Sequence, residues 1–181
     1  QGEVLQLQHK SEIDILEETY LKIISAKTAS LFAAATKVGP ILANKENKIK
    51  EALEFYGKNV GLTFQIADDT LDYNSDLKIL GKKIGNDFYE GKITLPIILL
   101  YQKSNSNEKK DLKELFLKQD RSENEFKKVL SLIKKYNIIF DCYEKAKYFI
   151  NLASNSLSIF EESKEKNIFQ NLTSFSLKRN Y

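Results

Sequence analysis

Hydrophobic side chains recur at every third or fourth position along most of this chain, which is the period of an amphipathic α-helix. The pattern predicts one long helix over residues 11–36, ended by Gly39-Pro40, and a second helix that begins at Asn44 and continues to Leu71. The positions expected to face the core are Ile13, Leu16, Tyr20, Ile23, Ile24, Leu31, Phe32, Ile49, Leu53, Tyr56, Val60, Phe64, Ala67 and Leu71. Because no alternating segments joined by a hairpin turn occur, we expect an all-α fold.

The second half of the chain continues the helical pattern. A loop containing Gly and Lys is expected over residues 74–86, and a short apolar helix from about Gly91 to Leu100. Beyond a polar link at residues 104–110 (SNSNEKK), further amphipathic helices are predicted at 112–117, 125–136, 141–160 and 165–178. The link is a candidate domain boundary, but each side alone offers a thin core, so we expect one continuous helical domain.

Composition limits the chemistry. The 181 residues include one Cys (Cys142) and one His (His9), which excludes an intrachain disulfide and argues against a His-based triad or a Cys- or His-rich metal site. A bound metal would therefore be held by carboxylates, which favours Mg²⁺ or Ca²⁺. The net charge of +3 is too weak to indicate nucleic-acid binding. No apolar run approaches the roughly 20 residues of a membrane-spanning helix.

An acidic cluster lies on the second long helix. Its members Gln65, Asp68, Asp69 and Asp72 have the spacing i, i+3, i+4 and i+7, which places an amide and three carboxylates on one stripe. Like charges at this spacing repel unless a cation neutralises them. A solvated acidic face is the alternative, but such faces normally interleave Lys, and none occurs between Asn59 and Tyr73. The pattern favours a hard-metal site.

Three lysines are candidate ligands for an anion. Lys82 and Lys92 follow the acidic cluster, each beside a glycine, where they would neutralise phosphate groups that share a metal with the carboxylates. Taken alone, they are equally consistent with a Lys-rich surface loop. Lys27 lies in an otherwise uncharged segment of small residues (26–35, AKTASLFAAA), where it pairs with a counter-charge, extends its charge to solvent or binds an anion. The alanines of this segment permit close helix packing or leave room for an apolar ligand.

As a set, these segments resemble the trans-isoprenyl diphosphate synthases, the polyprenyl synthetase family. Residues 64–72 (FQIADDTLD) are similar to the family's second aspartate-rich motif, FQxxDDxxD, and residues 81–96 (GKKIGNDFYEGKITLP) to the GKxxGxDxxEGKxTLP run that follows it. Lys27-Thr28 resembles the family's KT motif, and residues 2–6 (GEVLQ) resemble its GExxQ segment. The order and spacing agree along the whole chain, more loosely after Pro96.

The resemblance implies a helical bundle around a central cavity, with residues 1–181 as the C-terminal part of a single polyprenyl synthetase domain. It also implies head-to-tail prenyl transfer, in which Mg²⁺ and cationic side chains stabilise the diphosphate that leaves an allylic substrate. The substrates would be an allylic diphosphate and isopentenyl diphosphate, with no nucleic acid involved. The doubled aspartate favours elongation over the cyclisation carried out by terpene cyclases, which usually keep NSE- or DTE-type metal motifs at this site.

Individual roles follow from the same resemblance. Asp68 would be the main Mg²⁺ ligand, with Asp69 and Asp72 binding the metal directly or through water. Lys27 and Lys92 would hold the allylic diphosphate, supported by Lys82, while Gln65 and Thr28 would orient the substrate. The residues expected to act in catalysis are Lys27, Thr28, Gln65 and Asp68.

Residues 27–35 look most like those of long-chain synthases, which make octaprenyl to decaprenyl diphosphate for quinone side chains such as that of ubiquinone. The family implies a cytoplasmic homodimer, with heteromers in some members. The family's first DDxxD motif does not occur in this sequence. Because initiator Met is normally removed only before a small residue, and Gln1 is not small, we interpret position 1 as internal to a longer protein.

The missing motif leads to three hypotheses. In the first, the protein is a synthase of which this chain alone is inactive. In the second, it is a non-catalytic or partner-dependent subunit that lacks the first aspartate-rich motif. In the third, it is a plain helical interaction domain with an acidic face, which the ordered set of motifs disfavours.

Overall fold

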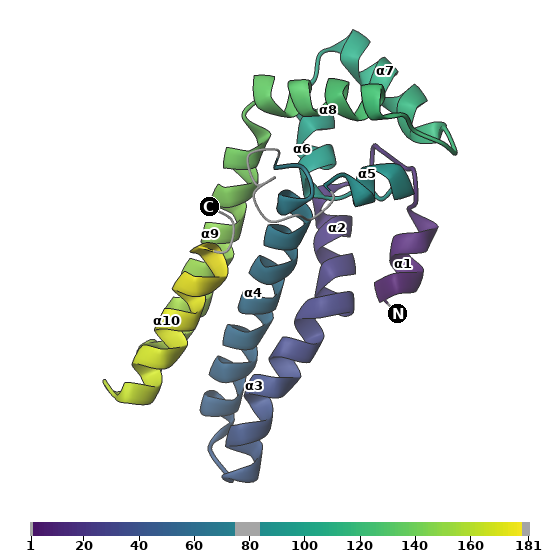
Figure 1. The fold of residues 1–181 in the computed structure, drawn as a ribbon. Coiled ribbons are helices and arrows are strands. Elements are labelled where there is room, and N and C mark those ends of the chain that lie inside the picture. Colours follow the sequence, from purple (N-terminus) through teal and green to yellow (C-terminus); the bar gives the residue numbers. More distant parts are fainter. Residues whose placement is uncertain (1, 75–83, 179–181) are drawn as a thin grey trace. The chain divides into compact units, whose positions relative to one another are not determined.

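The computed structural model describes residues 2–74 and 84–178, with side chains described as far as residue 173. Every regular element in these ranges is a helix, which confirms the all-α fold class (Figure 1). The elements are α1 (Gly2–Gln8), α2 (Glu17–Ile24), the π-helical segment η1 (Ser25–Ala29), α3 (Ser30–Leu42), α4 (Asn47–Leu71), α5 (Asn86–Glu90), α6 (Leu95–Lys103), α7 (Ser106–Leu117), α8 (Glu123–Lys135), α9 (Ile138–Ser156), the 3₁₀ turn η3 (Leu157–Ile159) and α10 (Lys164–Lys178). None of these described helices combines the length and the apolar character needed to cross a membrane.

The described residues form two compact units that alternate along the sequence. The first unit contains residues 2, 24–67 and 143–178, and the second contains residues 3–23, 68–74 and 84–142. The polar link at 104–110 is no boundary between them, since it lies inside the second unit. Helix α7 already begins there at Ser106, because Asn105 and Glu108 cap its first turn reciprocally.

In the first unit, α4 is the element on which the others pack. Tyr56 and Val60 of α4 form a buried cluster with Ala153 of α9 and Leu157 of η3. The hydroxyl of Tyr56 donates to the carbonyl of Phe169 in α10 at 2.7 Å, so this buried phenol has a partner. On the side of α3, Gly57 and Gly61 leave no room for a side chain, because an added Cβ would lie 2.4 Å from the Phe32 carbonyl oxygen and 2.6 Å from Ala29 Cα, respectively.

The first predicted long helix is wrong at both ends. It begins at Glu17 rather than residue 11, since Ser11 has a left-handed φ of 66°. It also continues past Gly39 to Leu42 with Pro40 buried inside its last turn. Proline is tolerated there because the helix loses only one backbone hydrogen bond, the one that would reach the Thr36 carbonyl.

Two leucines predicted to lie in the core are exposed. Leu16, which precedes α2, is 66% exposed, and Leu31 in α3 is 73% exposed. For Leu31 the cause is the π-helical segment η1, whose wider turn shifts the side-chain register, so that Ala29, Ala33 and Pro40 are buried instead. A plain 3.6-residue period does not anticipate that shift.

The second unit differs from the prediction mainly around α5. A one-turn helix at Asn86–Glu90, which the sequence did not predict, lies between the predicted loop and the apolar helix, and the apolar helix starts at Leu95, not at Gly91. Gly91 has φ 71°, which ends α5 in the left-handed conformation that glycine adopts without strain. Phe88 of α5 is fully buried against Phe116 and Phe126, with ring centroids 5.7 and 5.2 Å away, and this aromatic packing fixes α5 on the unit. Helices α7 to α10 confirm the four predicted segments, each with a shifted start.

We expect Gly61→Ala to lower the free energy of unfolding by about 1–3 kcal/mol, because its methyl group would overpack against Ala29. Gly39→Ala is the matched control, since nothing lies within 4 Å of its added Cβ, and it should change the stability by no more than about 1 kcal/mol. Urea unfolding of the three proteins measures both values. Equal effects of the two substitutions would contradict the close packing of η1 on α4.

The cap of α7 makes part of the stability depend on pH. Glu108 accepts hydrogen bonds from Lys135 Nζ at 2.7 Å, from the Tyr136 hydroxyl at 2.6 Å and from the Asn105 backbone at 3.0 Å. These partners, Lys135 first, lower the pKa of Glu108 from 4.5 to about 2. A depressed carboxyl pKa contributes stability that is complete above pH 4.5 and is lost as the pH falls towards 2.

Glu108→Gln should therefore destabilise the protein at pH 7, and the difference from the wild type should shrink steadily as the pH falls below 4.5. Glutamine keeps the capping acceptor, so the substitution removes mainly the charge. Glu114→Gln, at an exposed position of the same helix, is the control. Thermal unfolding at several pH values measures the difference, and a pH-independent gap would rule out the ionised carboxylate as its source.

Candidate active site

The acidic cluster lies where α4 ends. Gln65, Asp68 and Asp69 belong to the helix, and Asp72 follows its last residue, Leu71. Asp69 is 6% exposed and Asp72 is 8% exposed, while Asp68 is partly exposed. Burial of two carboxylates contradicts the alternative of a solvated acidic face. Asp72 does not complete the predicted helical stripe, since it stands in the turn after the helix.

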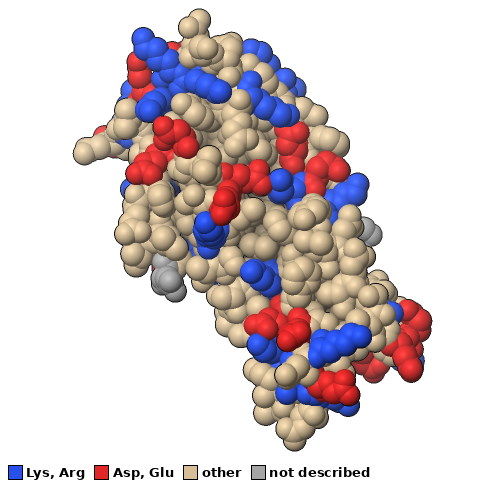
Figure 2. Space-filling view, turned by 180° about the vertical axis from the view of Figure 1, so that it is seen from behind, with Lys and Arg blue, Asp and Glu red and all other residues tan. Residues whose placement is uncertain are grey.

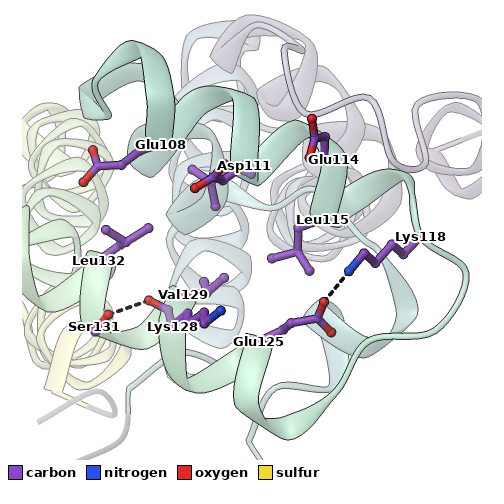
Figure 3. A pocket seen from close by; sticks show the side chains of 11 residues that line it. Glu108, Asp111, Glu114, Leu115, Lys118, Glu125, Lys128, Val129, Ser131 and Leu132 are labelled. Atoms are coloured by element: carbon purple, nitrogen blue, oxygen red, sulfur yellow. Dashed lines mark hydrogen bonds and ion pairs between the residues drawn. The ribbon is translucent and has the colours of Figure 1, made fainter.

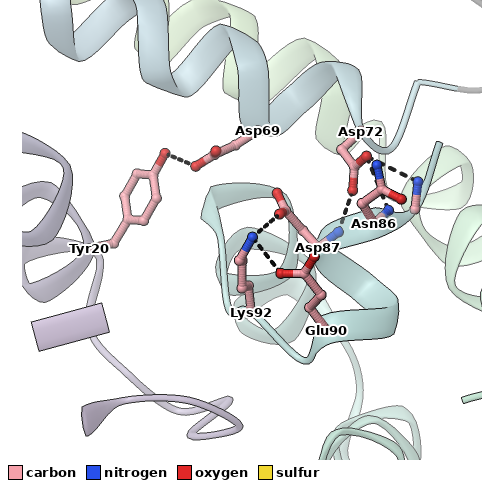
Figure 4. Close-up of polar contacts among 8 residues, drawn as sticks. Tyr20, Asp69, Asp72, Asn86, Asp87, Glu90 and Lys92 are labelled. Atoms are coloured by element: carbon pink, nitrogen blue, oxygen red, sulfur yellow. Dashed lines mark hydrogen bonds and ion pairs between the residues drawn. The ribbon is translucent and has the colours of Figure 1, made fainter. Parts of the chain in front are cut away.

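Asp69 is held by a tyrosine from a distant part of the chain. The hydroxyl of Tyr20, in α2, donates to Asp69 Oδ2 at 2.7 Å inside the second unit (Figure 4). Burial first, and then the charge of Asp69, raise the pKa of Tyr20 well above its ordinary value, so the phenol stays a protonated donor. The sequence predicted Tyr20 only as a core residue. The available signal was general, because a buried tyrosine hydroxyl needs a polar partner.

Asp72 directs its carboxylate to the backbone at the start of α5. Its Oδ1 accepts the N–H groups of Gly85 at 3.1 Å and Asn86 at 3.2 Å, and its Oδ2 accepts that of Asp87 at 2.7 Å (Figure 4). The carboxylate predicted as a metal ligand is thus bound to three amides in this structure.

Lys92 joins the same group through two acidic residues that the sequence analysis did not single out. Its Nζ lies 2.7 Å from Glu90 Oε2 and 3.3 Å from Asp87 Oδ1. Desolvation lowers the pKa of Lys92, but the hydrogen bonds and charges of Glu90 and Asp87 outweigh it, so the net shift is upward and the amine stays cationic. Burial and the charge of Asp72 raise the pKa of Asp87. The sequence signal for Asp87 was present, because it is the aspartate of the quoted GKxxGxDxxEGK pattern.

In the first unit the structure brings together two other predicted residues. Thr28 Oγ1 donates to Gln65 Oε1 at 2.7 Å, which joins the KT pair to the start of the acidic segment. Lys27 is exposed within η1, a π-helical turn of the kind that is frequent at functional sites. Gly2 packs directly on the Lys27 backbone, with the position of an added Cβ only 2.4 Å from its nitrogen. Lys82, the remaining predicted residue, lies outside the described residues.

Each unit contains a hollow. In the second unit, a groove of about 530 Å³ between α7 and α8 has an apolar floor that includes Leu112, Leu115 and Val129, and it contains none of the predicted site residues (Figure 3). In the first unit, a hollow of about 510 Å³ is lined by Ala33 and Ala34, among others. Ala33 is also buried in the packing, as expected for close helix packing. Room for an apolar ligand stays a prediction, since the same hollow is lined by charged side chains such as Lys37 and Glu54.

The donor atoms available for a metal are hard oxygens. Among residues 2–74 and 84–178, no group of three His, Cys, Asp or Glu side chains is arranged to hold a metal by itself. Mg²⁺ rarely needs such a cage, since it is usually bound by one or two carboxylates together with substrate phosphates and water. Asp68 and Asp69 fit that pattern.

The face of the molecule in Figure 2 shows acidic and basic side chains intermingled, in agreement with a net charge of only +3.

Comparison with known proteins gives consistent results. A sequence model of the family described as Polyprenyl synthetase matches residues 1–133. An all-trans-nonaprenyl-diphosphate synthase (geranyl-diphosphate specific) of Rhodobacter capsulatus is 36% identical over 179 residues, covering 99% of this chain and 54% of the relative. The chain thus spans about half the length of that curated protein.

Solved structures agree in fold. A decaprenyl diphosphate synthase from Rhodobacter capsulatus superposes with a TM-score of 0.93 at 30% identity, covering 99% of this chain and 55% of that one. A polyprenyl synthase from Caulobacter crescentus CB15, complexed with calcium and isoprenyl diphosphate, gives a TM-score of 0.92 at 35% identity, with coverage of 99% and 55%.

Tyr20→Phe should lower the free energy of unfolding by about 1.5–3 kcal/mol, because it removes a buried hydrogen bond to a carboxylate while keeping the ring. Tyr101→Phe, at a half-buried tyrosine of α6 in the same unit, is the control and should cost less than about 1 kcal/mol. Urea unfolding at pH 7 measures both. If the two variants proved equally stable, the Tyr20–Asp69 bond would contribute nothing beyond ring packing.

Proposed function

The chain belongs to the polyprenyl synthetase family, and we propose that it forms the C-terminal part of the active site of a trans-polyprenyl diphosphate synthase. The reaction joins isopentenyl diphosphate to an allylic diphosphate. The observation that carries the proposal is the cluster at the end of α4, where Asp69 and Asp72 are buried and Asp72 binds the backbone of Asp87, the residue that pairs with Lys92. Carboxylates for a divalent cation and a cation for phosphate oxygens are the groups that a diphosphate site requires.

Mg²⁺ bound at this site would neutralise the charge that develops on the diphosphate leaving group. Asp68 and Asp69 would hold the metal, and the Tyr20 hydroxyl keeps the Asp69 carboxylate in one orientation. The calcium and isoprenyl diphosphate named with the similar Caulobacter structure support a divalent cation together with a diphosphate.

The cationic side chains would bind the diphosphate itself. Lys92 would exchange its contacts with Glu90 and Asp87 for phosphate oxygens. Lys27 and Lys82 are proposed for the same substrate, as expected from their motifs. The hydrogen bond from Thr28 fixes the Gln65 carboxamide with its oxygen towards Thr28, so that the amide has a defined orientation for contacts with substrate.

The proposal extends to the length of the product, the oligomeric state and the cellular location. The product would be a long all-trans polyprenyl diphosphate that supplies a quinone side chain, and the names nonaprenyl and decaprenyl among the similar proteins support this length. On the basis of the family resemblance, we also propose that the protein is a homodimer located in the cytoplasm.

We propose as a second candidate a subunit that acts only with a partner. Residues 68–72 form one DDxxD motif, and the family resemblance implies two. In that case a second chain would supply the other aspartate motif.

MgCl₂ with inorganic diphosphate should raise the melting temperature of the full-length protein. At a ligand concentration 100 times Kd, the expected stabilisation is about 2.7 kcal/mol, or several degrees. Asp68→Ala should abolish this shift, whereas Asp120→Ala, in the exposed loop before α8, should preserve it. Differential scanning fluorimetry measures the shift. No shift for the wild type would contradict a diphosphate site of any kind.

The intact mass of the protein and its chain-elongation activity together distinguish the complete synthase from the partner-dependent subunit. The full-length protein is first weighed by intact mass spectrometry, then incubated with isopentenyl diphosphate, an allylic diphosphate and Mg²⁺. Chain elongation by the single protein identifies a complete synthase. Elongation that appears only after mixing with a protein carrying another DDxxD motif identifies the partner-dependent subunit.

A further inference from the structure

We propose that Asp72 is a positioning residue rather than a metal ligand: it anchors the backbone of α5 and thereby holds Lys92 in place to bind diphosphate. The inference rests on the proposed function for the role of Lys92, but the anchoring itself rests on the geometry of Asp72 alone.

The carboxylate of Asp72 is engaged on both oxygens. It accepts three consecutive backbone N–H groups, those of residues 85–87, at 3.1, 3.2 and 2.7 Å. The Gly85 N–H is shared with the backbone carbonyl of Asp72, at 2.9 Å. A carboxylate offers about four lone-pair positions, so three accepted bonds use most of its capacity. For Asp72 to turn to a metal, the part-buried N–H groups of Asn86 and Asp87 would lose the acceptor that this carboxylate provides.

Helix α5 depends on this anchor because it is too short to be stable by itself. It has five residues, and forming a first helical turn is unfavourable without tertiary contacts. Asp72 holds its start, and Phe88 is packed in the aromatic cluster at its centre. Gly85 has φ 90°, and an added Cβ there would lie 2.7 Å from the Phe126 ring, so the start of α5 has little room to shift.

Lys92 is connected to the anchored helix through Glu90, whose Oε2 lies 2.7 Å from the lysine Nζ, and through Asp87. Its backbone N–H donates to the Asp87 carbonyl at 2.9 Å, and its Nζ lies 3.3 Å from Asp87 Oδ1. Asp87 is the residue whose own N–H makes the shortest bond to Asp72, at 2.7 Å. The path from Asp72 to the ammonium of Lys92 therefore passes through one residue, and a loss of the anchor displaces the lysine.

Residue-resolved hydrogen exchange of the full-length protein tests the anchoring without any ligand. Asp72→Asn should speed the exchange of the amides of residues 85–87 by about tenfold or more, while Asp68→Asn and the exposed Asp111→Asn should leave them unchanged. Unchanged exchange in Asp72→Asn would overturn the proposal.

A measurement on the wild type covers the case in which Asp72→Asn does not fold. With saturating MgCl₂ and inorganic diphosphate, the amides of residues 85–87 should remain as protected as without them. Loss of protection on adding the two would mean that Asp72 leaves the backbone for the metal, which contradicts the proposal.

Binding measurements then separate a positioning role from a metal ligand. By isothermal titration calorimetry, Asp72→Asn should weaken diphosphate binding at saturating Mg²⁺ by about tenfold, and change the apparent Mg²⁺ affinity by less than about twofold. Asp68→Asn should mainly weaken the binding of Mg²⁺. In a Lys92→Gln background, Asp72→Asn should cause little further loss of diphosphate affinity, since both changes remove the same contact. Additive losses, or a weakened Mg²⁺ affinity in Asp72→Asn, would overturn the proposal.

These outcomes also distinguish the inference from the proposed function. A wild type that binds no Mg²⁺–diphosphate would refute the function while leaving the exchange result for Asp72 intact. A wild type that binds it, with exchange at residues 85–87 indifferent to Asp72, would refute only the inference.

Discussion

Carboxylates at the C-terminal end of a helix lie at the negative end of its dipole, and the acidic cluster of this protein occupies that position on α4. The helix dipole and the mutual repulsion of the carboxylates both disfavour their charged forms. Asp69 and Asp72 can therefore be buried only if other elements supply hydrogen-bond donors. The Tyr20 hydroxyl supplies one and the backbone at the start of α5 supplies three. In the second unit, α2 and the start of α5 therefore deliver the donors that the buried carboxylates require.

The same constraint relates structure to the proposed chemistry. Asp87 and Lys92 join the cluster as a partly buried pair, and the charge of Asp72 contributes to the raised pKa of Asp87. A site that gathers several carboxylates and one cation within a short distance has a strong local field for a divalent metal and a diphosphate. The three aspartates of the motif are therefore not equivalent, since each has a different environment.

In the first unit, a different constraint operates, which is the close approach of η1 and α3 to α4. Gly57 and Gly61 permit it, and the π-helical turn of η1 carries Lys27 and Thr28 at the contact. The turn shifts the register of all later residues in α3. It explains why Leu31, which continues the hydrophobic period of α2, is exposed.

Much of the fold follows from the sequence. The helical period predicted the all-α class and the positions of α4 and of α7 to α10, because each of these helices buries one face and its period is a local property. The motifs also singled out Asp68, Asp69, Lys92, Thr28 and Gln65, whose roles stay predictions, and the structure adds that Thr28 binds Gln65. The sequence did not reveal that Pro40 lies inside a helix or that α5 exists, because both depend on contacts that compensate for poor local propensity.

What the sequence determined by itself is therefore the helical periodicity and the set of chemical groups, both of which are encoded in neighbouring residues. What only the tertiary structure decided is which donor meets which carboxylate. Tyr20 is 49 residues from Asp69, and residues 85–87 are 13 to 15 residues from Asp72. Hydrogen bonds over such separations depend on the path of the chain, and no local pattern specifies that path.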